Sequence, residues 1–453
     1  MPKQEGQEGQ RGPAVGSRAP STTKTASASL ELTPDVLVCG GGLAGAMAAV
    51  AAARQGAQVL LVERYGFLGG NATGGAVAQF NSWQTSSGRP VIAGLAREVV
   101  ERLRAYGAAG EHQVFVMSTG HTMDRIEYAP EVLKLVLDDL ILEAGVQPLL
   151  HANVLDVEVT DGRLHTVRVL TKSGVLSLRP RVLVDTTGDI DVLHRAGARF
   201  LDLEEGDQLQ PATMMFRFGP IDYARFDALG PADLKTLARR GYEDGELARA
   251  ALHAARDPYS SDAWFNISRL GIDATDVTAL SRAEIEGRRQ AWRAAGYLRR
   301  AVPGCEAGRL QAFATQVGIR ETRRVHGDHV LTAEELSQPT VFDDGIAAGA
   351  YPIDIHPASG GELIYTPLGP DHAYQIPYRS LLPRDLRNTL VAGRGISATH
   401  AALAAIRVMT ISMAVGQAAG VAAALACAAD GEVRAVEAGP LRRLLLDQGA
   451  VLA

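Results

Sequence analysis

"DVLVCGGGLAGAMAAVAAARQGAQVLLVERYG", residues 35–66, decides the fold class of this chain. Its first apolar run, Val36–Cys39, is typical of a short strand that is buried on both faces of a parallel sheet. An alanine-rich helix is predicted next, and Gly56 is a natural place for that helix to end. A second apolar run, Val59–Val62, is closed by the acidic residue Glu63. The pattern predicts a strand–helix–strand unit, which places the chain in the α/β class.

The turn between the first strand and the helix carries glycines in the spacing G-x-G-x-x-G. Gly40 suits a tight turn, Gly42 lets the backbone approach a pyrophosphate, and Gly45 lets the helix pack closely on the strand. Free N–H groups and the dipole at the helix N-terminus favour that anion. Glu63 can accept hydrogen bonds from the hydroxyls of an adenosine ribose. The glycine spacing alone is weak, but in this strand–helix–strand context it predicts a dinucleotide-binding site.

A second glycine-rich loop, "YGFLGGNATGG" at residues 65–75, bears on which dinucleotide binds. An NAD-binding unit usually continues here into another helix, whereas a long loop lying over the cofactor suits an extended FAD. Asn71 and Thr73 could bond to pyrophosphate or ribityl oxygens. The alternative is a plain surface loop.

The rest of the chain supplies the other parts of such a domain. Residues 131–146 place apolar side chains at helical spacing, and two β-like runs around "TDGR" predict a hairpin. Further strands are predicted at "SGVLSL" and at "RVLVD", which ends in "TTGD". We predict a FAD-binding Rossmann-like domain with a β-meander and an inserted substrate or cap domain. The predicted segments are a disordered leader (1–30), the first part of the FAD-binding domain (31–200), the inserted substrate domain (201–384), the return strand with a cofactor helix (385–430) and a C-terminal tail (431–453).

The composition limits the class of protein. Of 453 residues, 46% are hydrophobic and 21% charged, as in a soluble globular protein. The formal net charge of −6 gives no support for binding nucleic acid or anionic lipid. The 3 cysteines form no CxxC pair, which disfavours a dithiol centre and fits a reducing compartment. We therefore expect a cytoplasmic protein and predict no metal site.

One apolar segment, Val408–Ala429, is long enough to cross a bilayer, which takes about 20 residues. It also holds Gly416 and Gly420 in the GxxxG spacing of membrane helices. Alanine and glycine dominate it, however, so its transfer into lipid gains little. We predict a helix buried against the first strand–helix–strand unit and no membrane partner; a membrane anchor is the alternative. Its N-terminal end could then stabilise negative charge on the pyrimidine edge of a flavin.

Several motifs taken together resemble one family of flavoproteins. They are "CGGGLAGAMAA", "FLGGNATGG", "LVDTTGDIDV", "QPATMMFRFG", "GIRETRRVHGDHVLT", "YPIDIHP", "IPYRSLLP" and "LVAGRGISATHAALAAIRVMTISMAVGQAAG". The combination resembles the FAD-dependent oxidoreductase family of glutathione-reductase-like flavoproteins, distantly related to the fumarate reductase and heterodisulfide reductase flavoprotein subunits. It covers roughly residues 33–428. The cysteine clusters of heterodisulfide reductase subunits have no counterpart in this sequence.

The resemblance implies a non-covalent FAD. It implies an adenine-side contact at Val154 and pyrophosphate or ribityl contacts at Gly393 and Arg394. The residues expected at the cofactor are Gly40, Gly42, Leu43, Ala44, Gly45, Glu63, Arg64, Gly69, Gly70, Asn71, Val154, Gly188, Gly393, Arg394 and Met413.

Five residues are candidates for the chemistry. Arg320 could bind a carboxylate bidentately, although an ion-paired helix face is the alternative. His356 and His400 could act as general acids or bases because the usual histidine pKa lies near neutral pH; a lone histidine is more often structural. Tyr378 and Arg379 could orient a substrate, or could pack at a domain interface.

Three functions are consistent with the sequence. The first is a FAD enzyme that transfers a hydride between flavin N5 and a small polar organic substrate. The second is a flavoprotein subunit that passes electrons to a partner protein, and the third is a non-redox, lyase-type FAD protein. A small-molecule substrate, an electron-transfer partner and a homodimer are the expected kinds of partner.

Overall fold

The centre of the molecule is a parallel sheet. The computed structural model describes residues 31–116, 122–358 and 364–452, so the predicted leader lies outside the described residues. Five strands pair in the order β20-β11-β2-β3-β7, all parallel. Their bounds are β2 (Val36–Cys39), β3 (Val59–Val62), β7 (Gln147–Leu149), β11 (Val182–Asp185) and β20 (Thr389–Val391). The predicted α/β class and the strand–helix–strand start are confirmed.

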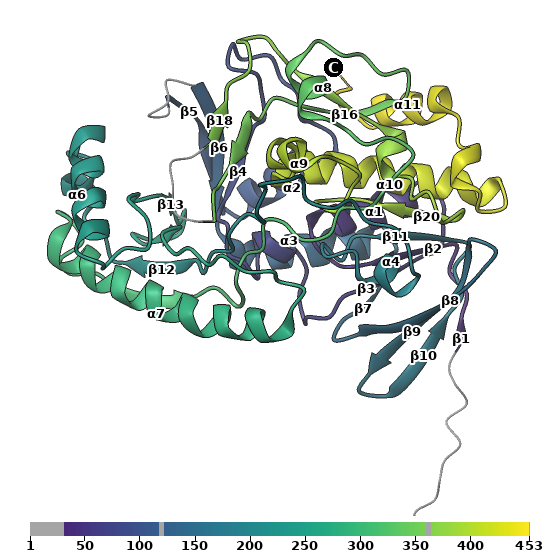
Figure 1. Cartoon of the computed structure of the whole chain (residues 1–453), viewed down its shortest axis with the longest axis horizontal. Helices are drawn as coiled ribbons and strands as arrows, with labels where there is room; N and C mark the ends of the chain where they lie inside the picture. The colour runs from purple at the N-terminus through teal and green to yellow at the C-terminus, as the bar shows by residue number, and fades with distance from the viewer. Residues whose placement is uncertain (1–30, 117–121, 359–363, 453) are drawn as a thin grey trace, which may run out of the picture.

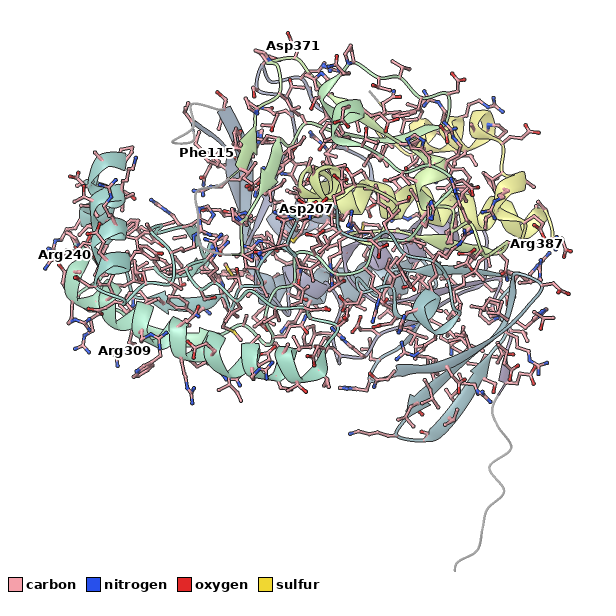
Figure 2. All side chains as sticks on the ribbon, viewed as in Figure 1. Phe115, Asp207, Arg240, Arg309, Asp371 and Arg387 are labelled. Atoms are coloured by element: carbon pink, nitrogen blue, oxygen red, sulfur yellow. The ribbon has the colours of Figure 1, made fainter. Side chains whose placement is uncertain are left out.

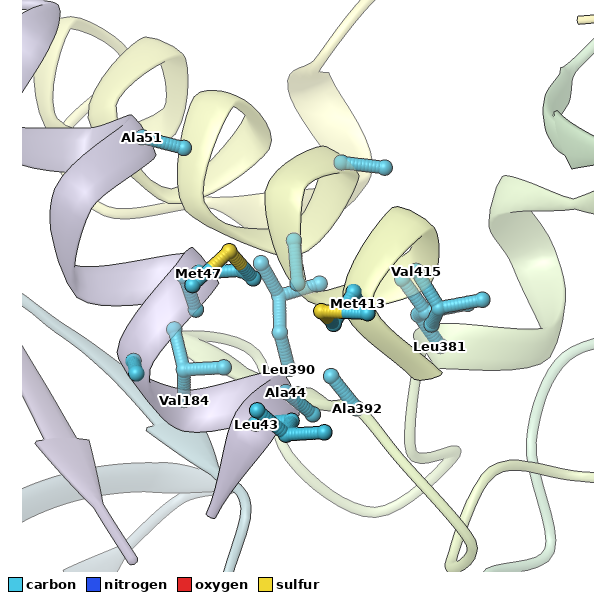
Figure 3. Packing of buried hydrophobic residues seen from close by; sticks show 14 of the residues in the cluster. Leu43, Ala44, Met47, Ala51, Val184, Leu381, Leu390, Ala392, Met413 and Val415 are labelled. Carbon is cyan, nitrogen blue, oxygen red and sulfur yellow. The ribbon is translucent and has the colours of Figure 1, made fainter. Parts of the chain in front are cut away.

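Two apolar helices pack together beside this sheet. They are α1 (Leu43–Arg54) and α10 (Met409–Ala428), shown in Figure 3. The helices α2 (Leu95–Ala105) and α3 (Pro130–Glu143) pack nearby. The helices α1 and α10 touch through Gly416 against Ala44 and Gly420 against Ala48. Among the described residues α10 is the one helix long and apolar enough to cross a membrane, and 72% of its apolar window is buried. The prediction that this segment is a buried helix is confirmed, because GxxxG here serves close packing onto α1.

The β-meander lies at one end of the molecule (Figure 1). Its antiparallel strands follow one another along the chain, and a short first strand pairs parallel to the last of them. Asp161 and Gly162 both have positive φ, as expected for a tight hairpin turn. The strands are β1 (Glu31–Leu32), β8 (Asn153–Thr160), β9 (Arg163–Thr171) and β10 (Gly174–Leu178).

A second hydrophobic core lies at the opposite end of the long axis (Figure 1). An antiparallel sheet in the order β13-β14-β12-β15 packs there against a long helix, α7. The core takes its residues from 76–78 and 212–317. The elements are β12 (Phe216–Gly219), α5 (Tyr223–Phe226), α6 (Pro231–Glu243), β13 (Ala254–Arg256), β14 (Ala263–Phe265), α7 (Val277–Ala301) and β15 (Arg309–Phe313).

The remaining elements pack mostly on the larger core. Buried residues between 325 and 382 join the larger core, which surrounds the parallel sheet. Only part of the predicted inserted domain, 201–384, therefore builds the second core. Segment 431–453 carries a helix, α11, whose Leu441 and Leu445 are fully buried. The elements are η1 (Gly70–Ala72), β4 (Gln79–Asn81), β5 (Ala109–Val116), β6 (Thr122–Tyr128), α4 (Asp191–Arg195), α8 (Ala333–Ser337), β16 (Gly345–Gly349), β17 (Ile353–Ile355), β18 (Ile364–Thr366), β19 (Tyr374–Pro377), η2 (Tyr378–Leu381), α9 (His400–Ile406), η3 (Val433–Ala435) and α11 (Ala438–Asp447).

Candidate functional site

A cavity of about 140 Å³ lies where the strands of the parallel sheet end. Glycine turns form much of its wall, and α10 contributes Met409 and Ser412. Most residues predicted at the cofactor line it: Gly40, Gly42, Leu43, Ala44, Glu63, Arg64, Gly69, Gly70, Asn71, Gly188, Gly393 and Arg394.

The first glycine turn has the geometry that an anion-binding turn needs. Gly40 has a φ of +102°, and a Cβ there would lie 2.6 Å from the carbonyl carbon of Thr186. A Cβ on Gly45 would lie 2.6 Å from the Thr186 hydroxyl, so the start of α1 sits tightly on the turn. Gly42 instead faces open space, with its nearest atom 4.0 Å from a built Cβ. It is the N-cap of α1 and makes no side-chain cap, so the first N–H groups of the helix are available to a phosphate.

Glu63 is fixed at the rim of this cavity. Its Oε2 accepts from the backbone N–H of Gly41 at 2.6 Å, and its Oε1 accepts from that of Tyr65 at 2.9 Å. Each carboxylate oxygen keeps a further lone pair, which is the acceptor that a ribose hydroxyl requires. The Tyr65 hydroxyl in turn bonds the side chain of Gln316, so the second core touches the loop that closes this end of the cavity.

Arg394 is held by a polar cluster between the sheet and the cavity. Its guanidinium pairs with Asp189 at 2.6 Å and donates to the Thr322 hydroxyl at 2.9 Å. Burial raises the pKa of Asp189, but the charge of Arg394 and the hydrogen bonds outweigh it and hold the pKa below its usual range. The "TTGD" turn therefore acts here through Asp189, which fixes the direction of an arginine on the cavity wall.

A larger cavity of about 400 Å³ adjoins the first. Asn71, Arg394, Arg407 and Met409 line both cavities, so the two form one continuous space. Strands of the β4-β6-β5 sheet close one side of it, including Phe115, which Figure 2 labels on β5. The cavity lies at the junction of the parallel-sheet core and the second core.

One wall of the larger cavity holds a hydrogen-bonded set of titratable groups. Oδ2 of Asp354 accepts from the Tyr351 hydroxyl at 2.9 Å and lies 3.3 Å from Nε2 of His356. Burial raises the pKa of Asp354, but the hydrogen bonds from His356 and Tyr351 and the charge of Arg407 outweigh it and keep the carboxyl ionised. Burial lowers the pKa of His356 to about 4, against the raising effect of its hydrogen bond to Asp354. At neutral pH this set is a carboxylate beside an uncharged imidazole.

Arginines surround that set. Burial and, after it, the nearby charges of Arg407 and Arg249 together lower the pKa of Arg320 to about 9. Arg320 still carries a charge at neutral pH and donates to the Thr213 hydroxyl at 2.8 Å. Arg407 donates to Gln210 at 3.1 Å, while its buried Nε has no partner in the described part of the chain. The cavity is thus positively charged.

The family model described as "FAD dependent oxidoreductase" matches residues 35–445. The chain belongs to this family. Its cofactor is FAD, and the glycine turn, the open N-terminus of α1 and Glu63 fit the diphosphate and ribose of that cofactor. It is an oxidoreductase, as its family is.

Solved structures give a weaker likeness. A geranylgeranyl bacteriochlorophyll reductase-like protein from Thermoplasma acidophilum matches with 13% identity over 92% of this chain and 83% of the other, with a TM-score of 0.45. The p-nitrophenol 4-monooxygenase PnpA from Pseudomonas putida DLL-E4 matches with 12% identity over 92% and 85%, with a TM-score of 0.46. The flavin-dependent brominase Bmp2 matches with 13% identity over 92% and 83%, with a TM-score of 0.47. The comparison with curated proteins returned no match.

Several residues predicted for the site of this FAD-dependent oxidoreductase lie outside both cavities. The His400 ring is 2.8 Å from buried Glu321, which is also 3.6 Å from Arg324. The Tyr378 hydroxyl donates to the carbonyl of Val433, and Arg379 pairs with Asp344 at 3.0 Å. These placements agree with the structural alternatives considered for His400, Tyr378 and Arg379.

Three predicted cofactor residues also lie away from the cavity surface. Gly45 stands behind the turn, where it sets the helix–strand distance. Met413 is fully buried on α10, packed in the larger core (Figure 3). Val154 lies in β8 of the meander and is only partly buried.

The sequence analysis missed several polar residues of the larger cavity. Of its catalytic candidates, Arg320 and His356 line the cavity. Asp354 and Arg407 belong to motifs quoted above, so the local sequence held a signal for them. Arg249, His253 and Asn266 come from an irregular stretch around β13 and β14, where residue type and spacing give no signal.

Proposed function

We propose that this enzyme transfers a hydride between N5 of FAD and a small polar organic substrate bound in the larger cavity. The observation that carries the proposal is the continuity of the two cavities through Asn71, Arg394, Arg407 and Met409. A ligand in the larger cavity would therefore lie next to the dinucleotide. Bound FAD supplies the hydride acceptor or donor.

His356 is the residue that we assign to proton transfer. If Nε2 carries the proton and donates to Asp354, then Nδ1 keeps a lone pair and can accept a proton from the substrate. Asp354 orients the ring and stabilises the imidazolium that forms, as in other carboxylate–histidine pairs. Tyr351 holds the same carboxylate in place from the other side.

The proposal also covers the family relationships of the protein, its location in the cell and its partners. The quoted motifs support a place among the glutathione-reductase-like flavoproteins, with fumarate reductase and heterodisulfide reductase subunits as distant relatives. Buried, unpaired Cys39, Cys305 and Cys427 are consistent with a cytoplasmic location. We propose no nucleic acid and no membrane as partners; a homodimer or a protein electron acceptor is compatible with the proposal.

The test follows the visible absorbance of the bound flavin under anaerobic conditions. Photoreduction and reoxidation by air establish redox activity, and a panel of small metabolites then identifies compounds that bleach the flavin. His356→Asn should slow bleaching by roughly 10²- to 10⁴-fold, the usual loss when a general base is removed. His165→Asn is the matched control, because His165 is exposed on β9 in the meander.

Other outcomes select the other functions. Reduction that requires an added protein would favour an electron-transfer subunit. A flavin that neither dithionite nor any metabolite reduces would favour a non-redox role. Equal bleaching rates for His356→Asn and the wild type would remove His356 from the chemistry.

A further inference from the structure

We propose that the substrate of the larger cavity is a small organic carboxylate that also carries a hydroxyl or amino group. This inference rests on the proposed function, since it names the substrate class for the same site. It comes from two features of the cavity wall: cations in excess of anions, and buried acceptors that lack donors.

The first feature is an imbalance of charge. Arg249, Arg320 and Arg407 line the cavity, and Asp354 is the one carboxylate among its lining residues. No hydrogen bond or ion pair joins the Arg249 guanidinium to any residue that the structure describes. Arg394 also lines the cavity, but Asp189 already pairs with it. Arg320 and Arg407 donate to uncharged groups and, like Arg249, form no ion pair with any residue that the structure describes. A planar guanidinium matches a carboxylate bidentately. The cavity is therefore built to receive an anion.

The second feature calls for a donor on the same ligand. Oδ1 atoms of Asn81, Asn266 and Asp354 are buried, and each lacks a hydrogen-bond partner within the described ranges. All three residues line the larger cavity. Buried acceptors are almost always satisfied, so a ligand with an O–H or N–H group is the expected partner. A plain carboxylate such as propionate would satisfy the arginines but bring no donor to these acceptors, the Asp354 carboxylate above all.

The chemistry of such a substrate fits the groups in the cavity. Its oxidation breaks one C–H bond and one O–H or N–H bond, and a C=O or C=N bond forms. Two electrons leave the carbon as hydride, which the FAD of the proposed function accepts. The proton passes to Nδ1 of His356. A carboxylate held by the arginines also brings negative charge near His356, which favours the protonated ring at the moment when the proton is transferred.

The experiment measures binding apart from turnover. The oxidised holoenzyme is titrated with lactate, alanine, propionate, lactamide and inorganic phosphate, and the shift of the visible flavin spectrum reports binding, whereas its bleaching reports reduction. Lactate or alanine should bind at least about tenfold more tightly than propionate, which lacks the donor, and than lactamide, which lacks the charge. Whichever of lactate and alanine binds more tightly tells whether the substrate is a hydroxy acid or an amino acid.

Arg249→Met isolates the charge, because that side chain holds nothing else in place. The variant should bind the preferred acid about 10- to 100-fold more weakly, with unchanged affinity for lactamide and unchanged FAD content. Arg240→Met is the matched control: Arg240 lies on α6 at the far end of the molecule (Figure 2), and its side chain is 74% exposed. Equal affinity for lactamide and lactate, phosphate binding as tight as the best acid, or unchanged acid binding in Arg249→Met would overturn the inference. Acid binding as expected in a protein whose flavin is never reduced would instead reject the redox function and leave the binding assignment in place.

Discussion

Substitution of Gly416 by alanine should loosen both the fold and the hold on FAD. An added Cβ would lie 2.8 Å from the carbonyl carbon and from the Cα of Ala44, and closer still to the carbonyl oxygen of Ala44. Carbon atoms in contact prefer about 3.5–4.0 Å, so α1 and α10 must separate by roughly 1 Å. Overpacking of this kind costs about 1–3 kcal/mol, and alanine recovers up to about 1 kcal/mol of helix propensity. A net loss of about 1–2 kcal/mol corresponds to a fall in Tm of about 2–8 °C for a domain of 150–250 residues.

The measurement combines Tm with the FAD content of the purified protein. FAD content should fall together with Tm, because Ala44, in the first turn of α1, lines the dinucleotide cavity. Gly416→Leu should lower both the Tm and the FAD content further than Gly416→Ala does. Gly296→Ala is the control: it also lies within a helix, α7, but a Cβ there meets only the mobile end of Arg300, at 3.2 Å. A Gly416→Ala protein with wild-type Tm and full FAD occupancy would refute the close-packing argument.

Two further predictions concern titratable groups. Glu63→Ala should weaken FAD retention by about 1–3 kcal/mol, because a charged acceptor for the ribose is lost; equilibrium dialysis checks this, and retention equal to wild type would remove Glu63 from the site. His253 lines the larger cavity, where desolvation and the neighbouring charges of Arg125 and Arg249 lower its pKa from 6.5 to about 3. Its neutral form therefore stabilises the folded state fully above pH 6.5, and this contribution is lost as the pH falls toward 3. Between about pH 6 and 4, the free energy of unfolding measured in urea should change with pH less steeply for His253→Asn than for the wild type, by about 1.4 kcal/mol per pH unit. An unchanged slope would contradict the lowered pKa of His253.

The sequence predicted the elements whose signal is local. The apolar run Val36–Cys39 and the glycine turn behind it specify a buried strand and a helix start with little help from the rest of the chain. The hairpin turn at Asp161 and Gly162 is equally local, because positive φ at both positions limits the residues that can form it. The segment Val408–Ala429 could be assigned because small residues without charge suit close packing more than lipid.

The larger cavity could not be predicted in the same way. Its polar residues come from segments far apart in the chain, such as Asn81, Arg249 and Asp354, and only tertiary packing brings them together. His400 and Tyr378 stand beside cofactor motifs in the sequence, but the structure places both outside the two cavities. Burial directs their polar atoms to Glu321 and to a backbone carbonyl instead.

The strand order of the parallel sheet has a consequence for synthesis of the protein on the ribosome. β2 has β3 on one side and β11 on the other, while β20 and α10, which also belong to this domain, are made near the end of the chain. At roughly 5–20 residues per second, the roughly 350 residues between β2 and β20 take roughly 20–70 s to translate. During that interval the alanine face of α1 has no α10 to cover it. Stable capture of FAD is therefore a late event that follows translation of almost the whole chain, because α10 supplies Met409 and Ser412 to the cofactor cavity.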